Sequence, residues 1–117
     1  MIGHAVRLKS EIWVHAFLRK CQVEGMYGAV LNKGAPEAGA VYVIVNHLDG
    51  TQHFFGPAPR PAYDADGNRR WIEELPFPAP QHEIDRVIGR RLKSDPDIWV
   101  VEVEDRKGTA GIVVARD

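Results

Sequence analysis

The stretch Val41–Phe55, VYVIVNHLDGTQHFF, decides the fold class of this 117-residue chain. Two runs rich in Val, Ile and aromatic residues, Val41–Leu48 and Thr51–Phe55, flank Asp49-Gly50. An Asp-Gly pair between two strand-like runs is a strong signal for a β-hairpin, because both residues tolerate the positive φ angles of a two-residue type I′ turn. The sequence therefore predicts an antiparallel strand pair at its centre.

The two-residue turn also predicts the register of this hairpin. It places His47 opposite Gln52, and Asn46 opposite His53. Because side chains alternate across a strand, His47 and His53 are then expected on opposite faces of the sheet. On this register the two histidines should not bind one metal ion.

Two helices are predicted, one before and one after the hairpin. The segment Glu11–Glu24 contains no Gly or Pro, and Ser10 before it offers an N-cap oxygen. Its apolar face is broad, which suggests deep burial or a partner. The segment Gln81–Ser94 has the apolar spacing of an amphipathic helix and must end before Pro96.

Further strands are expected at Met26–Asn32, Arg69–Leu75 and Ile98–Glu104, and Ala110–Ala115 can return as a final strand. Together these elements predict an α+β fold, with two helices on a mostly antiparallel sheet of about four to six strands. If the second helix is a crossover between parallel strands, the sheet is mixed and helices can cover both of its faces.

We expect residues 1–117 to form one domain, since the length lies in the common range for single domains. The predicted core consists of apolar residues from both helices and from three of the strands. They are Ile12, Phe17, Leu18, Val43, Val45, Phe54, Ile84, Ile88, Trp99 and Val101.

Composition excludes several classes of protein. Lys and Arg number 15 and Asp and Glu 16, for a net charge of −1, whereas dedicated nucleic-acid binders usually carry a basic excess. The single cysteine cannot form an internal disulfide, which favours a reducing compartment. No secretory signal is visible, and the longest apolar stretch, Ile12–Leu18, is too short to span a bilayer. A cytoplasmic location without a membrane partner is expected.

Candidate metal and thiol sites have structural explanations. The segment Asp64–Asn68 resembles the opening of a calcium loop, but Arg69 and Leu75 occupy the positions that need Gly and a bidentate Glu. A turn explains the same residues. Cys21 falls in the last turns of the first helix, where the helix dipole disfavours a thiolate, so a buried and inert thiol is expected. No metal site, cofactor or catalytic residue is predicted, and whether the chain is an enzyme stays open.

Two groups of side chains carry the binding alternatives. Asn46, Thr51 and His53 form the one convergent neutral polar group that the predicted register provides, and they are the candidate ligand-binding residues. A basic stretch on the second helix could contact phosphates; it consists of Arg86, Arg90, Arg91 and Lys93. Nearby acidic residues dilute that charge, so nucleic acid is disfavoured as a partner.

Four segments resemble a known family. They are Arg7–Val14 (RLKSEIWV), Val45–Thr51 (VNHLDGT), Gly56–Pro59 (GPAP) and Asp95–Glu102 (DPDIWVVE). In this order they are similar to the small alphaproteobacterial proteins grouped as domain of unknown function 1491, over residues 7–108. The resemblance implies a cytosolic single-domain protein in which no catalytic residues are established.

Three functions follow as expectations. The first is a non-catalytic module that binds a protein partner or forms a homodimer, because the first helix is broadly apolar and sheet edges are exposed. The second is a small-ligand-binding or enzymatic domain with a site beside the Asp49-Gly50 hairpin. The third, weaker, is nucleic-acid binding through the second helix.

Overall fold

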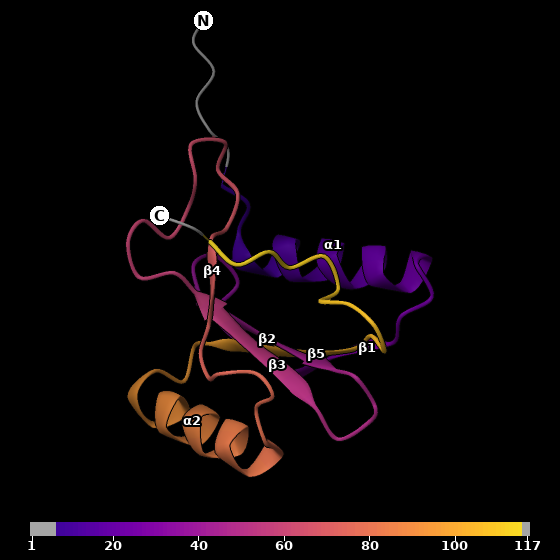
Figure 1. Ribbon diagram of the computed structural model, residues 1–117. Helices are drawn as coiled ribbons and strands as arrows, with labels where there is room; N and C mark the ends of the chain where they lie inside the picture. Colours follow the sequence, from indigo (N-terminus) through magenta and orange to yellow (C-terminus); the bar gives the residue numbers. More distant parts are fainter. Residues whose placement is uncertain (1–6, 116–117) are drawn as a thin grey trace, which may run out of the picture.

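The computed structural model describes residues 7–115, which form a five-stranded mixed sheet with two helices (Figure 1). The α+β fold class predicted from the sequence is confirmed. In chain order the elements are α1 (Ser10–Val23), β1 (Gly28–Asn32), β2 (Val41–Asn46), β3 (Gln52–Pro57), β4 (Trp71–Glu73), α2 (Gln81–Ser94) and β5 (Trp99–Glu104).

The sheet has the order β1-β5-β2-β3-β4 and is built around one parallel pair. Strands β2 and β5 pair in parallel, from Val41 beside Trp99 to Asn46 beside Glu104. All other neighbours are antiparallel. Strand β4 therefore runs in the direction of β5, and α2 connects the two as the expected crossover.

The two helices cover opposite faces of the sheet (Figure 1). Odd-numbered residues of β2, such as Val43 and Val45, pack in the core cluster that includes α1 residues. Even-numbered residues, such as Ile44, pack with Ile84 of α2. Because both faces are covered, Val41–Val45 is buried without interruption, as is typical of strands with two covered faces.

The predicted core is largely confirmed. Seven of its ten members are buried: Phe17, Val43, Val45, Phe54, Ile84, Trp99 and Val101. Leu18 and Ile88 are partly buried against the two clusters. Ile12 was wrongly placed in the core, since its side chain is 52% exposed. The buried residues of α1 follow a stripe that starts at Ser10. Ile12 lies about 200° around the helix from that residue.

The predicted hairpin register is wrong by one residue. Asn46 pairs with Gln52 and Val45 with His53, and the His47 N–H donates to the Thr51 carbonyl. The connection is thus a three-residue loop, residues 48–50, rather than a two-residue turn.

Side-chain hydrogen bonds stabilise this longer loop. The Asn46 Oδ1 accepts from the Leu48 N–H (2.8 Å), and Leu48 has a φ of 64°. The Asp49 carboxylate accepts from the N–H (2.9 Å) and the hydroxyl (2.6 Å) of Thr51. Side chains alternate between the two faces of a sheet. A register shift of one residue therefore changes which residues of the two strands share a face. His47 and His53 therefore share a face, and Asn46 lies on the opposite one.

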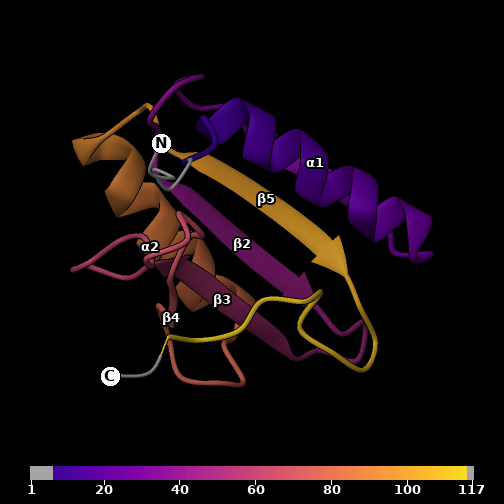
Figure 2. The ribbon, with the colours of Figure 1, turned by 90° about the horizontal axis from the view of Figure 1, so that it is seen from above.

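The segment expected as a final strand, Ala110–Ala115, is not one. The Asp105 carboxylate accepts from the backbone N–H groups of Lys107, Gly108 and Ala110, and Ala110 has a φ of 53°. This compact turn sends the chain back across the α1 face of the sheet toward β4 (Figure 2). Only an isolated bridge joins Val114 to Trp71, and it covers the outer edge of β4.

The strand β1 lies at the other edge of the sheet, and β5 is its one strand partner in residues 7–115. Loop residues after β1 then pack closely on the start of β5. The Ala35 N–H donates to the Asp97 carbonyl (2.9 Å), and the Trp99 indole donates to the Ala35 carbonyl (2.8 Å).

This close approach predicts the effect of two glycine substitutions. A Cβ atom at Gly34 would lie 2.6 Å from the Ile98 carbonyl carbon and from Trp99 Cδ1. We expect Gly34→Ala to lower the free energy of unfolding by about 1–3 kcal/mol, measured by urea denaturation. Gly89→Ala, on the exposed side of α2 where nothing lies within 4 Å, should raise it by about 0.5–1 kcal/mol. Equal effects of the two substitutions would contradict the packing described for Gly34.

The turn at Asp105 predicts a pH dependence of stability. Burial alone would raise the pKa of this carboxyl, but the N–H groups of Ala110, Lys107 and Gly108 hold the pKa below its ordinary value of 3.8. Asp105 therefore stabilises the fold above that pH, and this contribution is lost as the pH falls through the lower folded-state pKa. In urea titrations, Asp105→Asn should destabilise the protein at pH 7 and less so at pH 3. Asp66→Asn, on an exposed turn, serves as the control and should show no such trend.

Candidate functional site

The three residues predicted to bind a ligand do not converge. Asn46 lies on the α2 face, where its Nδ2 donates to a Glu102 oxygen at 3.4 Å. His53 lies on the α1 face beside Glu73, and the Thr51 hydroxyl is engaged by Asp49. The expected cross-strand pair of Asn46 and His53 is wrong, because the hairpin register places Val45 opposite His53.

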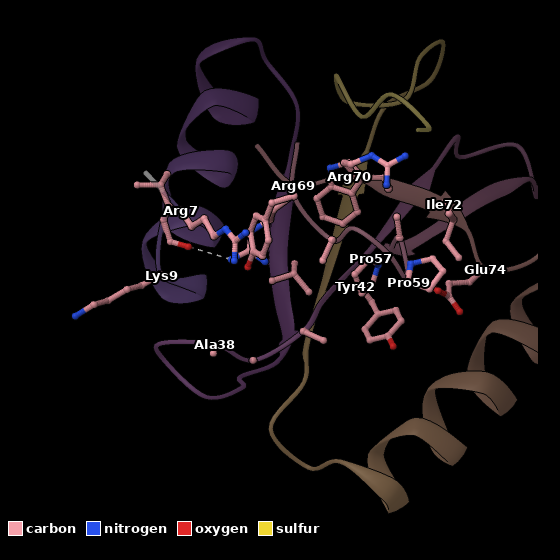
Figure 3. A pocket seen from close by; sticks show the side chains of 18 of the residues that line it. Arg7, Lys9, Ala38, Tyr42, Pro57, Pro59, Arg69, Arg70, Ile72 and Glu74 are labelled. Carbon is pink, nitrogen blue, oxygen red and sulfur yellow. Dashed lines mark hydrogen bonds between the residues drawn. The ribbon is translucent and has the colours of Figure 1, made fainter. Parts of the chain in front are cut away.

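A large hollow lies at the other end of the sheet (Figure 3). It has a volume of about 850 Å³. Its walls come mainly from four segments: the residues before α1, the loop that enters β2, the end of β3 with the following loop, and β4 with Glu74 after it. Arg91 of α2 adds one further side chain. This pocket is assembled from chain segments that are distant in the sequence.

Arg69 is the central polar group of the pocket. Its Nη2 donates to the Leu8 carbonyl and to the Ser10 hydroxyl, both at 3.2 Å. The guanidinium carbon lies 5.7 Å from the Trp13 ring centroid and 5.4 Å from that of Tyr63. Its Nε is buried and has no hydrogen-bond partner in the part of the chain that the structure describes. Burial lowers the pKa of Arg69, and no carboxylate in residues 7–115 pairs with it.

A second arginine shares the Tyr63 ring with Arg69. The guanidinium carbon of Arg7 lies 4.5 Å from the ring centroid of Tyr63. Two positive charges therefore flank one aromatic ring, and neither contacts a carboxylate among the described residues. Lys9 points away from this pair and forms its ion pair with Glu37 at 3.9 Å (Figure 3).

The opposite wall of the pocket is largely apolar. Pro57, Pro59, Ile72 and Tyr42 line it, as Figure 3 shows. The carboxylate of Glu74 lies here, but Arg91 donates to it at 2.9 Å, so this charge is compensated. The pocket thus has a cationic end and an apolar end.

A turn outside the sheet positions the cationic end. Tyr63 and Arg69 form an antiparallel bridge, and Asp64 accepts hydrogen bonds from the N–H groups of Asp66 and Asn68, both at 2.9 Å. The hydrogen bonds from Asn68 and Asp66 hold the pKa of Asp64 below its ordinary value. The calcium-like segment is therefore a hydrogen-bonded turn, and its role is to place Tyr63 and Arg69 beside each other.

The buried Ser10 hydroxyl connects α1 to this site. Ser10 was expected as the N-cap, but it is the first residue of α1 and makes no capping hydrogen bond through its side chain. Its Oγ instead donates to the Gly39 carbonyl at 2.6 Å and accepts from Arg69. The N–H groups of Ser10 and Glu11 donate to the Glu37 and Pro36 carbonyls, which fixes the loop that lines the pocket.

The sequence did not indicate that Arg69 lines a pocket. It predicted this residue only as the start of a strand and as the residue that breaks a calcium loop. The Cys21 side chain is 1% exposed and burial raises its thiol pKa, which confirms the expected buried thiol.

The comparisons with known proteins identify the relatives of the chain. The family described as "Protein of unknown function (DUF1491)" matches residues 8–112. The chain belongs to the DUF1491 family. This confirms the resemblance seen in the sequence, and all pocket-lining residues except Arg7 fall within the matched range.

Solved structures of DUF1491 proteins share the fold. A crystal structure of a family member from Caulobacter crescentus is 34% identical, with a TM-score of 0.76, and the match covers 93% of this chain and 97% of that one. The solution structure of an A. tumefaciens protein is 36% identical, with a TM-score of 0.78, over 95% and 98% of the two chains. A search of curated proteins found no match.

Neither a membrane-spanning helix nor a cluster of metal-binding side chains is found among the described residues. None of the helices within residues 7–115 is long and apolar enough to cross a membrane. Across the same residues, no group of three or more His, Cys, Asp or Glu side chains has the arrangement of a metal centre.

The Ser10 hydroxyl allows a test of how the site is held together. Ser10→Ala leaves the buried Gly39 carbonyl without its donor and removes one acceptor from Arg69. We expect the free energy of unfolding to fall by about 1–3 kcal/mol in urea denaturation. Ser94→Ala, at the exposed end of α2, should change it by less than about 0.5 kcal/mol. A loss no larger than that of Ser94→Ala would contradict the anchoring role.

Proposed function

We propose that this DUF1491 protein binds a small organic anion in the pocket that contains Arg69. The observation that carries the proposal is the half-buried Arg69 guanidinium, which faces a large hollow without a carboxylate partner in the described chain. Partly burying an arginine is costly unless the charge is compensated, and ligand-binding sites are where such groups are commonly found.

The chemistry of the cationic end favours a carboxylate or a phosphate monoester. Arg presents a planar fork of N–H donors that matches the two oxygens of such groups. Both Arg7 and Arg69 lie against the Tyr63 ring, so an anion placed beside them would reduce the repulsion between two like charges.

The apolar end favours a ligand with a hydrophobic body. Pro57, Pro59 and Ile72 offer a rigid, largely apolar wall, and the neighbouring Glu74 is already paired with Arg91. Small-molecule sites are commonly lined by apolar residues with a few polar groups that orient the ligand. The ligand is therefore expected to carry its charge at one end.

The other functions expected from the sequence have less support. Exposed apolar side chains lie on different elements, such as Ile12 on α1, Leu31 on β1 and Phe77 in a loop, and scattered exposure of this kind is ordinary. On α2, Arg91 is engaged by Glu74 rather than free for phosphates. A cytoplasmic setting belongs to our proposal, since the single cysteine is a free, buried thiol.

The test is ligand binding by the full chain, measured by calorimetric titration. We expect phenyl phosphate and benzoate to bind in a saturable manner, whereas benzyl alcohol, which lacks the charge, does not. Arg69→Gln should weaken the binding of both anions by about tenfold or more, because it removes a charge-assisted hydrogen bond. Arg69→Lys should retain part of the affinity.

Arg86→Gln is the matched control, since Arg86 lies on the exposed side of α2 outside the pocket. It should leave the affinity unchanged. Thermal melts show whether each variant is folded. If the wild-type protein binds neither anion at millimolar concentration, or if Arg69→Gln binds as tightly as the wild type, the proposal is wrong.

A further inference from the structure

Two histidines lie side by side at the hairpin end of the sheet, on the face that α1 covers. His47 follows β2 and His53 lies in β3, with ring centroids 5.2 Å apart and ring planes at 53°. His47 pairs with Thr51 and His53 with Val45, so the two histidines are diagonal neighbours across the strand pair. Long side chains reach each other across such a diagonal.

Each histidine is held through its Nδ1 atom. The His47 Nδ1 lies 3.2 Å from the Arg106 carbonyl oxygen, and the His53 Nδ1 lies 2.7 Å from Glu73 Oε1. A carbonyl and a carboxylate accept hydrogen bonds, so each Nδ1 is the donor. In the neutral rings the lone pair is then on Nε2. Histidines that bind metals show this arrangement, in which the second ring nitrogen donates to a carboxylate or a backbone carbonyl.

Neither Nε2 atom has a hydrogen-bond partner within residues 7–115. The His47 Nε2 is also buried. A buried polar atom without a partner is uncommon, and an ion or a water molecule often explains it. Arg106 follows β5 and Glu73 lies in β4, on opposite sides of the histidine pair. The Nδ1 contacts thus hold the two rings from opposite sides of the pair.

We propose that His47 and His53 bind one divalent transition-metal ion of the zinc type through their Nε2 atoms. Two imidazoles bound to one tetrahedral zinc ion, with bonds of about 2.0–2.1 Å, have their ring centroids about 5 Å apart. The observed separation of 5.2 Å matches this geometry. No third His, Cys, Asp or Glu among residues 7–115 completes the site, so water supplies the other ligands.

The surroundings of the histidine pair favour a cation. The carboxylates of Asp49 and Asp105 lie close enough to His47 to interact with its ring electrostatically. Phe77 stacks on the His53 ring at 4.1 Å, and Phe55 stacks on it at 5.2 Å. Phe77 also meets the His47 ring edge-on at 5.7 Å, so these contacts hold the orientation of both rings.

The experiment titrates ZnCl2 into the full chain at pH 7.5 and measures heat and the imidazole nitrogen shifts by NMR. We expect one equivalent of zinc to bind and to shift the Nε2 signals of His47 and His53. His47→Ala and His53→Ala should each weaken binding by about tenfold or more. Glu73→Gln, a change at a positioning residue, should weaken it by about 10–100-fold while the stoichiometry stays at one.

His82→Ala is the control, since His82 is exposed on α2. It should bind zinc as the wild type does, and thermal melts without zinc show whether the other variants are folded. The absence of saturable zinc binding, or binding that survives both His47→Ala and His53→Ala, would overturn the proposal. Zinc-induced changes in Nε2 chemical shift that are confined to other histidines would also overturn the proposal. The anion pocket lies at the other end of the sheet, so this result does not bear on it.

Discussion

The parallel pairing of β2 with β5 is the constraint on which the rest of the structure depends. Parallel neighbours need a long connection between them, and here that connection includes the hairpin, β4 and α2. Strand β2 is buried on both faces over Val41–Val45, so each face of the sheet needs its own cover. The helix α1 and the C-terminal segment supply one cover, and α2 supplies the other.

The same pairing separates two polar regions. Because β2 and β5 run in one direction, the loops that precede them meet at one end of the sheet, and the residues that follow them meet at the other. The first end contains Arg69 and the pocket. The second contains His47, Arg106 and Asp105, which all follow the ends of these strands. Loops beyond the strand ends are where binding groups can be placed without interrupting the core.

Residues that follow a local pattern were predictable from the sequence, and those that depend on distant partners were not. Periodicity was sufficient for both helices and for β2 and β3, whereas the sequence left open whether the sheet is mixed. The hairpin register failed because the side chains of Asn46 and Asp49 stabilise a longer loop, and that one-residue error hid the histidine pair. The pocket was missed because Arg69 meets Ser10 and Leu8 only after folding.

The bridge between Val114 and Trp71 also affects how the sheet could grow. A sheet with two free edges can add strands at both sides and so assemble without end, as fibres do. Here the returning chain covers the β4 edge at Trp71, and within residues 7–115 the β1 edge has neither a further strand nor such a bridge beside it. If a second copy of the chain paired with the first through β1, the free edge of each molecule would be occupied. Assembly through the sheet edges would then stop at a dimer.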